Sequence, residues 1–199
     1  MTKKNKRERM FKRMEIKILI VCYSYSGKTR RIAEMIQKQT GGRLSRIYPR
    51  QPYPADFQSL LTQVREEIRT GRKVPLLPVE ENADEYDVVF AGSPNWCGTI
   101  APPVASWLCE NDLTGKKVIP FFSHCGGEDK GMELAVRNFC PSAEMGSGLY
   151  VLENGSEDLH DMVRKWLKRN RLEIHRERNS FRWEENEFRQ KKPTENLAI

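Results

Sequence analysis

Three hydroxyl residues and one glycine stand between an apolar run and a segment with helical periodicity. The apolar run is "IKILIVCY", and the stretch "SYSGKT" after it contains Ser24, Ser26, Gly27 and Thr29. Backbone N–H groups at a helix start lack helical partners, so with the helix dipole they attract an anion. Hydroxyls can donate further hydrogen bonds to phosphate oxygens. The stretch predicts a loop for one phosphate monoester without a metal ion; the alternative is an ordinary strand-to-helix turn.

The triplet Gly27-Lys28-Thr29 also matches the end of the loop that binds nucleoside triphosphates, whose pattern is G-x-x-x-x-G-K-[ST]. The first glycine of that pattern would fall at Cys22. A Cβ there blocks the wide loop that wraps a triphosphate chain. The run "YDVVFAGS" also ends in Ser93, not in an acidic residue that could hold magnesium. The sequence therefore argues against a triphosphatase.

Two later stretches are also rich in small and polar residues, and each follows a strand-like run. They are "SPNWCGT" at 93–99 and "SHCGG" at 123–127. Trp96 in the first stretch carries a large aromatic face that is costly to expose and would suit a flat ligand. The alternative is that Trp96 only packs on a neighbouring loop.

Periodic segments predict the elements that position these stretches. Strand-like runs occupy 16–23, 43–49, 86–93, 116–127 and 146–154, and helical periodicity occupies 29–42, 55–71, 102–111, 130–139 and 156–170. A helix after each strand predicts an α/β fold: a doubly wound, five-stranded parallel sheet with helices on both faces. Ligands of such sheets bind at the carboxyl ends of the strands. The residues at 23–29, 93–99 and 123–127 should therefore meet at one edge.

The charge of the chain is unevenly distributed. The 199 residues carry a formal net charge of +7, of which residues 1–13 hold +6 and residues 164–199 hold +5, which leaves −4 for 14–163. We predict a basic extension at 1–13, one domain at 14–170 and a charged extension at 171–199. Binding to nucleic acid, anionic lipid or an acidic partner would concern the ends alone. We favour solvated extensions, with no strong case for nucleic acid or membrane.

Cysteine usage and hydropathy indicate a cytoplasmic protein. The five cysteines are an odd number without a C-x-x-C pair, so neither a disulfide framework nor a zinc site is expected, and no metal is predicted. No apolar run approaches the roughly 18 residues of a membrane span. Cys97 and Cys125 fall in neighbouring stretches, where a redox pair is one reading and two inert thiols the simpler one.

The phosphate stretch resembles the phosphate loop of the flavodoxin family, usually [ST]-x-[ST]-G-x-T. The blocks "YPADFQSLL", "GSPNWCGTIAPPVASWL" and "LTGKKVIPFFSHCGG" resemble a subgroup of flavodoxin-like proteins, and the resemblance covers about 14–168. It implies a flavodoxin-like fold that binds FMN, in the short-chain form, because "GLYVLEN" has no long insertion. Lys28 is a departure, since the family commonly has Asn there.

The resemblance assigns FMN contacts to all three stretches. In the first stretch the expected cofactor-binding residues are Ser24, Tyr25, Ser26, Gly27, Lys28 and Thr29, with the three hydroxyls of Ser24, Ser26 and Thr29 on the phosphate. The residues expected to contact the flavin ring are Ser93, Pro94, Asn95, Trp96, Cys97, Gly98 and Thr99 in the second stretch and Ser123, His124, Gly126 and Gly127 in the third. Trp96 would stack on the isoalloxazine. His124 would either stabilise negative charge on the reduced ring or only order its loop. The third stretch lacks the second aromatic that electron carriers of the family commonly place there.

Several functions stay open at this point. An FMN-cycling redox protein could carry electrons between protein partners, or it could be an enzyme that takes hydride from NAD(P)H and reduces a quinone, flavin or other small acceptor. The acidic body suits docking on basic partners, whereas the open third stretch suits an enzyme. A non-redox binding module on the same scaffold is a further alternative. A homodimer is also compatible with the sequence.

Overall fold

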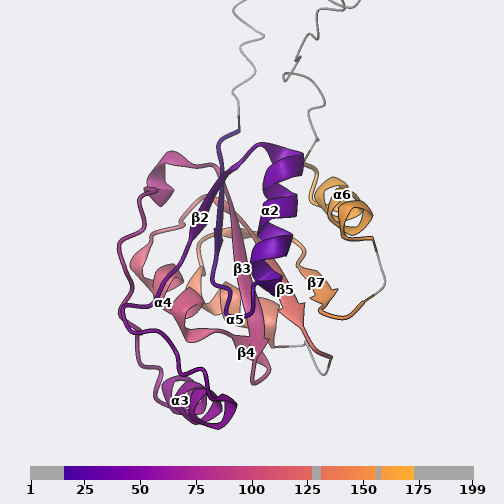
Figure 1. Ribbon diagram of the computed structural model, residues 1–199. Helices are drawn as coiled ribbons and strands as arrows, with labels where there is room; N and C mark the ends of the chain where they lie inside the picture. The colour runs from indigo at the N-terminus through magenta and orange to yellow at the C-terminus, as the bar shows by residue number, and fades with distance from the viewer. Residues whose placement is uncertain (1–15, 127–130, 156–157, 173–199) are drawn as a thin grey trace, which may run out of the picture.

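The computed structural model of the protein describes residues 16–126, 131–155 and 158–172 (Figure 1). The predicted extension at 1–13, most of that at 171–199, and Gly127 lie outside these residues. The strands are β1 (Ile18–Cys22), β2 (Arg43–Arg46), β3 (Val88–Trp96), β4 (Thr99–Ile100), β5 (Lys117–His124), β6 (Glu144–Met145) and β7 (Leu149–Leu152). The helices are α2 (Lys28–Thr40), α3 (Phe57–Thr70), α4 (Pro102–Glu110), α5 (Met132–Phe139) and α6 (Leu159–Arg169), with a 3₁₀ turn η1 (Ala83–Glu85).

The strands form one sheet in the order β2-β1-β3-β5-β6, with β7 also on β5. All pairs are parallel except that of β4 with β3. The predicted parallel α/β sheet is confirmed. Its fifth position is divided, because β6 pairs with the start of β5 at Lys117–Val118 and β7 with the end at Phe121–His124.

The division of the fifth strand has a local cause in α6. The amide of Ser147, between β6 and β7, donates to Asn170 Oδ1 at 2.9 Å, and its carbonyl accepts from Trp166 Nε1 at 2.7 Å. These side chains satisfy backbone groups that would otherwise need a ladder partner. The space is also tight, because a Cβ on Gly146 would stand 2.6 Å from Asn170 Oδ1. The helix therefore interrupts the strand while holding it in place.

The alternation of side chains along the strands builds two cores. Leu19 and Val21 of β1 belong to the core beneath α4 and α5, and the intervening Ile20 belongs to the core beneath α2 and α6. Figure 1 shows α2 and α6 together on one face of the sheet and α4 and α5 on the other. Both faces of the central strands are thereby covered, as a parallel sheet requires.

Helix α3 lies apart from the two layers, beyond the carboxyl ends of the strands and close to β4 (Figure 1). Its start is capped by Asp56, whose carboxylate accepts from the Ser59 amide at 2.8 Å. Only Leu60 and Val64 of this helix are buried. The position of α3 brings its last turns to the edge of the sheet where ligands bind in such folds.

Within the residues that the structure describes, no helix is long and apolar enough to cross a membrane.

Candidate functional site

The loop between β1 and α2 forms the start of the site. Gly27 occupies the N-cap position of α2 with a left-handed φ of 88°, a conformation in which a Cβ would be strained. No side chain of the described residues caps the helix there, and its first closing bond runs from the Arg31 amide to the Gly27 carbonyl at 3.1 Å. The amides of the first turn therefore need a partner from outside the helix.

The hydroxyls predicted for phosphate occupy different environments. The Ser24 Oγ is buried and has no hydrogen-bond partner in the described part of the protein, whereas Ser26 is exposed. The buried Thr29 hydroxyl pairs with Ser123 Oγ at 2.9 Å and so connects the first loop to the end of β5. A hydroxyl without a partner lies here beside an uncapped helix start, and both supply hydrogen-bond donors that lack acceptors. A phosphate group, whose oxygens are acceptors, fits this arrangement.

The stretch 93–99, expected as a loop, is mainly a β-hairpin. β3 continues to Trp96, which pairs with Thr99 of β4. The two residues between them, Cys97 and Gly98, both have positive φ, at 54° and 80°. That combination is the type I′ turn favoured in two-residue hairpins, because its twist matches that of the strands. The Gly98 amide also donates to Asn95 Oδ1 at 3.0 Å. The hairpin places Cys97 and Gly98 at an exposed tip.

Ser93 and Pro94, two residues predicted to contact the flavin ring, are buried below the exposed tip of the hairpin. Ser93 is fully buried, and its hydroxyl donates to the Pro94 carbonyl and accepts from the Ala101 amide, both at 2.8 Å. Pro94 is buried as well. The Ser93 side chain therefore fixes the hairpin to the start of α4. Because its side chain is already used, Ser93 could contact a cofactor only through its backbone.

Trp96 belongs to a cluster of four aromatic rings drawn from three loops. Its ring centroid lies 5.3 Å from that of Tyr23, 5.0 Å from that of Tyr53 and 6.1 Å from that of Tyr25. All three contacts are edge-on, with interplanar angles of 69–84°. Both sequence readings retain support, since Trp96 packs on neighbouring loops and is also only partly buried at the tip. Its stacking on a flavin stays a prediction.

The aromatic cluster is anchored to its surroundings by two phenol groups. The Tyr53 hydroxyl donates to Glu67 Oε2 of α3 at 2.6 Å, and the Tyr25 hydroxyl donates to the Pro54 carbonyl at 2.8 Å. Burial, followed by the hydrogen bond to Glu67, raises the pKa of Tyr53 above its ordinary value. Sequence reasoning missed Tyr23 and Tyr53. The signal was available in "IKILIVCY" and "YPADFQSLL", where a tyrosine stands at the end of a strand or in a shared block.

The third stretch begins at the end of β5. Ser123 is buried, His124 is partly buried, and Cys125 and Gly126 are exposed. The His124 carbonyl accepts from the Glu153 amide at 2.8 Å, which attaches the strand end to the segment after β7. Burial, and then the nearby Glu153 carboxylate, raise the pKa of Cys125. Cys97 and Cys125 are both free thiols, and a redox pair between them stays a prediction.

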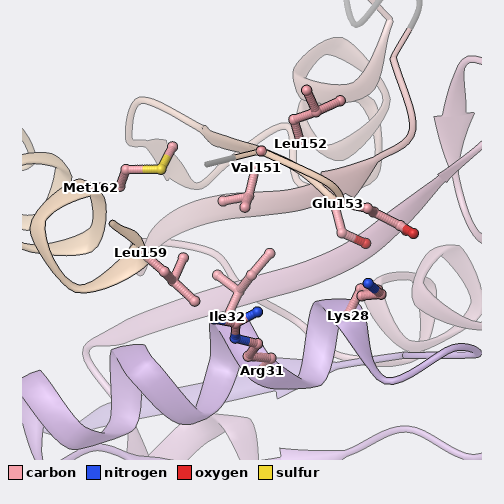
Figure 2. Close-up of a pocket in the computed structure, with 10 residues that line it drawn as sticks. Lys28, Arg31, Ile32, Val151, Leu152, Glu153, Leu159 and Met162 are labelled. Carbon is pink, nitrogen blue, oxygen red and sulfur yellow. The ribbon is translucent and has the colours of Figure 1, made fainter. Parts of the chain in front are cut away.

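A small cavity adjoins the start of α2 and lies between α2, β7 and α6. Figure 2 shows Lys28 and Arg31 of α2 on one side, Glu153 opposite, and the apolar side chains of Leu159 and Met162 along the α6 wall. Its volume is about 60 Å³, and because a cavity of roughly 10–15 Å³ can hold one water, it has room for a few water molecules. This cavity cannot hold an isoalloxazine ring. The ring would have to lie at the hairpin edge.

Several solved structures share this fold. A candidate flavoprotein from Bacteroides eggerthii DSM 20697 is 26% identical, with a TM-score of 0.70 over 79% of this chain and 99% of that one. Another from Bacteroides uniformis ATCC 8492 is 23% identical, with a TM-score of 0.68 over 77% and 98%. A flavoprotein in complex with FMN from Lactobacillus acidophilus NCFM is 23% identical, with a TM-score of 0.62 over 76% and 98%.

No curated protein matches the chain. The flavodoxin family matches residues 17–170, which span the whole sheet and all five described helices. The sheet order and the hydroxyl loop before α2 agree with that match. The chain therefore belongs to the flavodoxin family.

Proposed function

We propose that this chain binds FMN at the carboxyl edge of the sheet and serves as a redox protein. The observation that carries the proposal is the buried, unpartnered Ser24 hydroxyl beside the uncapped start of α2. A phosphate there would accept from this hydroxyl and from the first amides of the helix. Membership of the flavodoxin family and the FMN in the similar Lactobacillus structure support the same cofactor.

Each part of the edge has its own task in this proposal. Ser24, Ser26 and the backbone after Gly27 hold the phosphate. Trp96 offers a face to the ring, with Asn95, Thr99 and the backbone of Cys97 and Gly98 as hydrogen-bonding groups. His124 faces the negative charge that reduction adds to the ring, where a fixed dipole or a cation is stabilising. The bound FMN supplies redox chemistry in one-electron or two-electron steps.

The binding test uses the full-length protein and a matched pair of ligands. The protein should be yellow on purification, and denaturation should release FMN identified by chromatography. Removal of the Trp96 ring by Trp96→Ala should weaken the binding of FMN and of riboflavin alike, because both carry the ring. A colourless protein that rejects added FMN would refute the redox proposal and leave a non-redox binding module. Unchanged affinity in Trp96→Ala would show that this ring faces elsewhere.

A second candidate is an enzyme that reduces its FMN with NAD(P)H and passes the electrons to a quinone or another small acceptor. The supporting observation is the third stretch. Phe121 and Phe122 are completely buried and cannot cover a ring, and the tip holds only the exposed Cys125 and Gly126 before the described segment ends. One flavin face would then be open to a nicotinamide.

Rapid mixing of the FMN-loaded protein with NADH or NADPH under anaerobic conditions separates the two candidates. The enzyme would bleach the flavin absorbance in one saturable phase and return it when a quinone is added. A protein that stays oxidised with both nicotinamides, but accepts electrons from a reduced protein partner, would be a carrier. The net negative charge of residues 14–163 favours a basic partner protein in that case.

A further inference from the structure

A second cavity lies on the far side of the β3–β4 hairpin from the phosphate loop. It has a volume of about 200 Å³ and is enclosed by the end of α3, by β4 and by α4 and α5. The phosphate loop precedes α2 on the opposite face of the sheet, so the two places are separate. They share only the hairpin, because Thr99 lines the cavity and is paired with Trp96.

The walls of this cavity are apolar. Ile68 lines it from α3, Ile100 from β4, Pro102 and Ala105 from the first two turns of α4, and Phe139 from α5. Phe139 keeps 37% of its surface exposed beside this hollow. A ligand with an apolar body would cover these groups and remove them from water.

The rim of the cavity is positively charged. Arg72 and Lys73 follow directly after α3 and line the cavity, and within the described residues neither has an ion-pair partner. The acidic group among the lining residues, Glu67, already accepts from Tyr53 and Gln63, at 2.6 and 2.8 Å. These neutral donors leave the charge of Glu67 in place, so the lining carries two cations against one carboxylate, and a ligand with one negative charge would meet a rim of net positive charge.

The carboxyl end of α3 carries partial negative charge, which is compatible with the positive charges of the neighbouring Arg72 and Lys73. The carbonyls of Glu67 and Ile68, where the negative end of the helix dipole lies, accept from the amides of Arg72 and Gly71. The following segment is held in place by Val74, whose amide donates to the buried Ser106 Oγ of α4 at 2.7 Å. The two cations thus stand on a backbone that is fixed to both walls.

The size of the cavity limits its ligand. About 200 Å³ lies below the roughly 300–1,000 Å³ of sites that enclose drug-sized molecules. A dinucleotide or a whole FMN does not fit, whereas one flat ring system does. A single carboxylate on such a ring would reach the rim while the ring stays between the apolar walls.

We propose that this cavity is an accessory binding site for a small aromatic carboxylate, with the ring between Ile100, Ala105 and Phe139 and the carboxylate at Arg72 and Lys73. The site does not depend on FMN, because none of its charged groups belongs to the phosphate loop. An occupant would contact the hairpin through Thr99. It would therefore adjoin the flavin edge without entering it.

The test titrates the full-length protein with 2-naphthoate, both FMN-loaded and FMN-free, followed by calorimetry and by amide chemical shifts. Saturable binding should perturb the amides of Thr99, Ile100 and Ala105, and 2-naphthylmethanol, which has the same ring without the charge, should bind about fivefold more weakly. Equal binding of the two, no saturation, or shifts confined to other residues would overturn the proposal. Failure to take up FMN would not, because the FMN-free arm stands alone.

Two variants locate the carboxylate and the ring. Replacing both rim cations by Arg72→Gln and Lys73→Gln should weaken 2-naphthoate about fivefold and leave 2-naphthylmethanol unchanged. The exposed Arg65 of α3 and Lys38 of α2 do not line the cavity, so Arg65→Gln combined with Lys38→Gln is the matched control for the loss of two charges and should bind as the parent does. Ala105→Leu fills the hollow and should weaken both ligands. Equal effects of the rim variant and the Arg65 and Lys38 control would contradict the assignment.

Discussion

At the scale of single residues, the hydroxyls of the first loop divide into two roles. Thr29 is joined to Ser123 of β5, so it holds two parts of the site together. The Ser24 Oγ is buried and has no hydrogen-bond partner among the described residues, which costs free energy in the protein alone. A buried polar group without a partner is rare in proteins and needs an explanation. A bound phosphate supplies one.

The Ser24 hydroxyl should therefore matter for phosphate and not for the flavin ring. Ser24→Ala should weaken FMN binding by about tenfold or more, since hydrogen bonds to charged groups contribute about 1.5–3 kcal/mol. Riboflavin, which lacks the phosphate, should bind as before. The FMN-free variant should be as stable as the parent or slightly more stable in urea, because an unsatisfied group is removed. Comparable losses for FMN and riboflavin would contradict this role.

The cysteines differ in reactivity because they differ in burial. Burial raises the pKa of the Cys22 thiol to about 12 and that of Cys140 to about 11, from an ordinary value of 9.0. Cys97, Cys109 and Cys125 are exposed. Maleimide at pH 8 should therefore label three thiols in the folded protein and all five in denaturant, as mass spectrometry can count.

The same shifts predict how stability responds to alkaline pH. A folded-state pKa above the unfolded one means that the native thiol keeps its proton while the unfolded chain loses it. The stability from Cys22 and Cys140 is complete below about pH 9 and declines as the pH rises toward 11–12. Denaturant titrations at pH 8 and pH 10.5 would measure the decline. Cys22→Ala with an unchanged dependence on pH would show that other groups cause it.

At the scale of elements, close packing between neighbouring strands determines which residues β3 can hold. Gly92 is such a position, because a Cβ built on it would stand 2.2 Å from Phe121 Cζ and 2.8 Å from Cys22 Cβ. The ring of Phe121 thus occupies the space where a side chain of β3 would lie. The strand needs a glycine here for this approach and not for an unusual backbone angle.

Gly92→Ala should consequently destabilise the fold by about 1–3 kcal/mol, the usual cost of overpacking a core. Urea unfolding monitored by circular dichroism would measure the change. Phe121→Leu shortens the opposing side chain, so the double variant should recover part of the stability lost in Gly92→Ala. Purely additive losses in the double variant would show that Phe121 is not the obstacle.

At the scale of the whole molecule, the described cores and the family match fall in the same central part of the chain. Both clusters lie between Ile18 and Leu172, and the family matches residues 17–170. The charge of the two ends, by contrast, is opposite in sign to that of 14–163. We therefore predict that folding and cofactor binding belong to the central part.

A chain of residues 14–172 should fold cooperatively and bind FMN with the affinity of the full chain. A chain of residues 14–155 is the control, because it lacks α6 and with it the buried Trp166 and Leu167; it should not unfold cooperatively. Circular dichroism and FMN titration would compare the three. Lost FMN affinity in the 14–172 chain would place a contact to the cofactor in one of the ends.

The sequence by itself determined the order of the main strands and helices and the parallel sheet, and it located the hydroxyl-rich loop before the first helix. Hydrophobic periodicity indicates which side chains of a segment are buried, and hydroxyls before a helix indicate which hydrogen bonds that segment can make. Both signals depend on neighbouring residues alone, so they can be read without knowledge of distant contacts. Gly27 and Lys28 are placed where the loop pattern predicts the start of a helix. The boundaries were less accurate, as in the hairpin at 93–99 and the divided fifth strand.

Only the tertiary structure decided which predicted side chains are available for a ligand. Thr29 and Ser123 are 94 residues apart yet share a hydrogen bond, Ser93 is used inside the protein, and Trp96 stands among three tyrosines from other loops. Spacing along the chain cannot express such contacts, because they arise where parallel strands bring their carboxyl ends together. The free Ser24 hydroxyl and the cavity behind the hairpin emerge only from that meeting of distant segments.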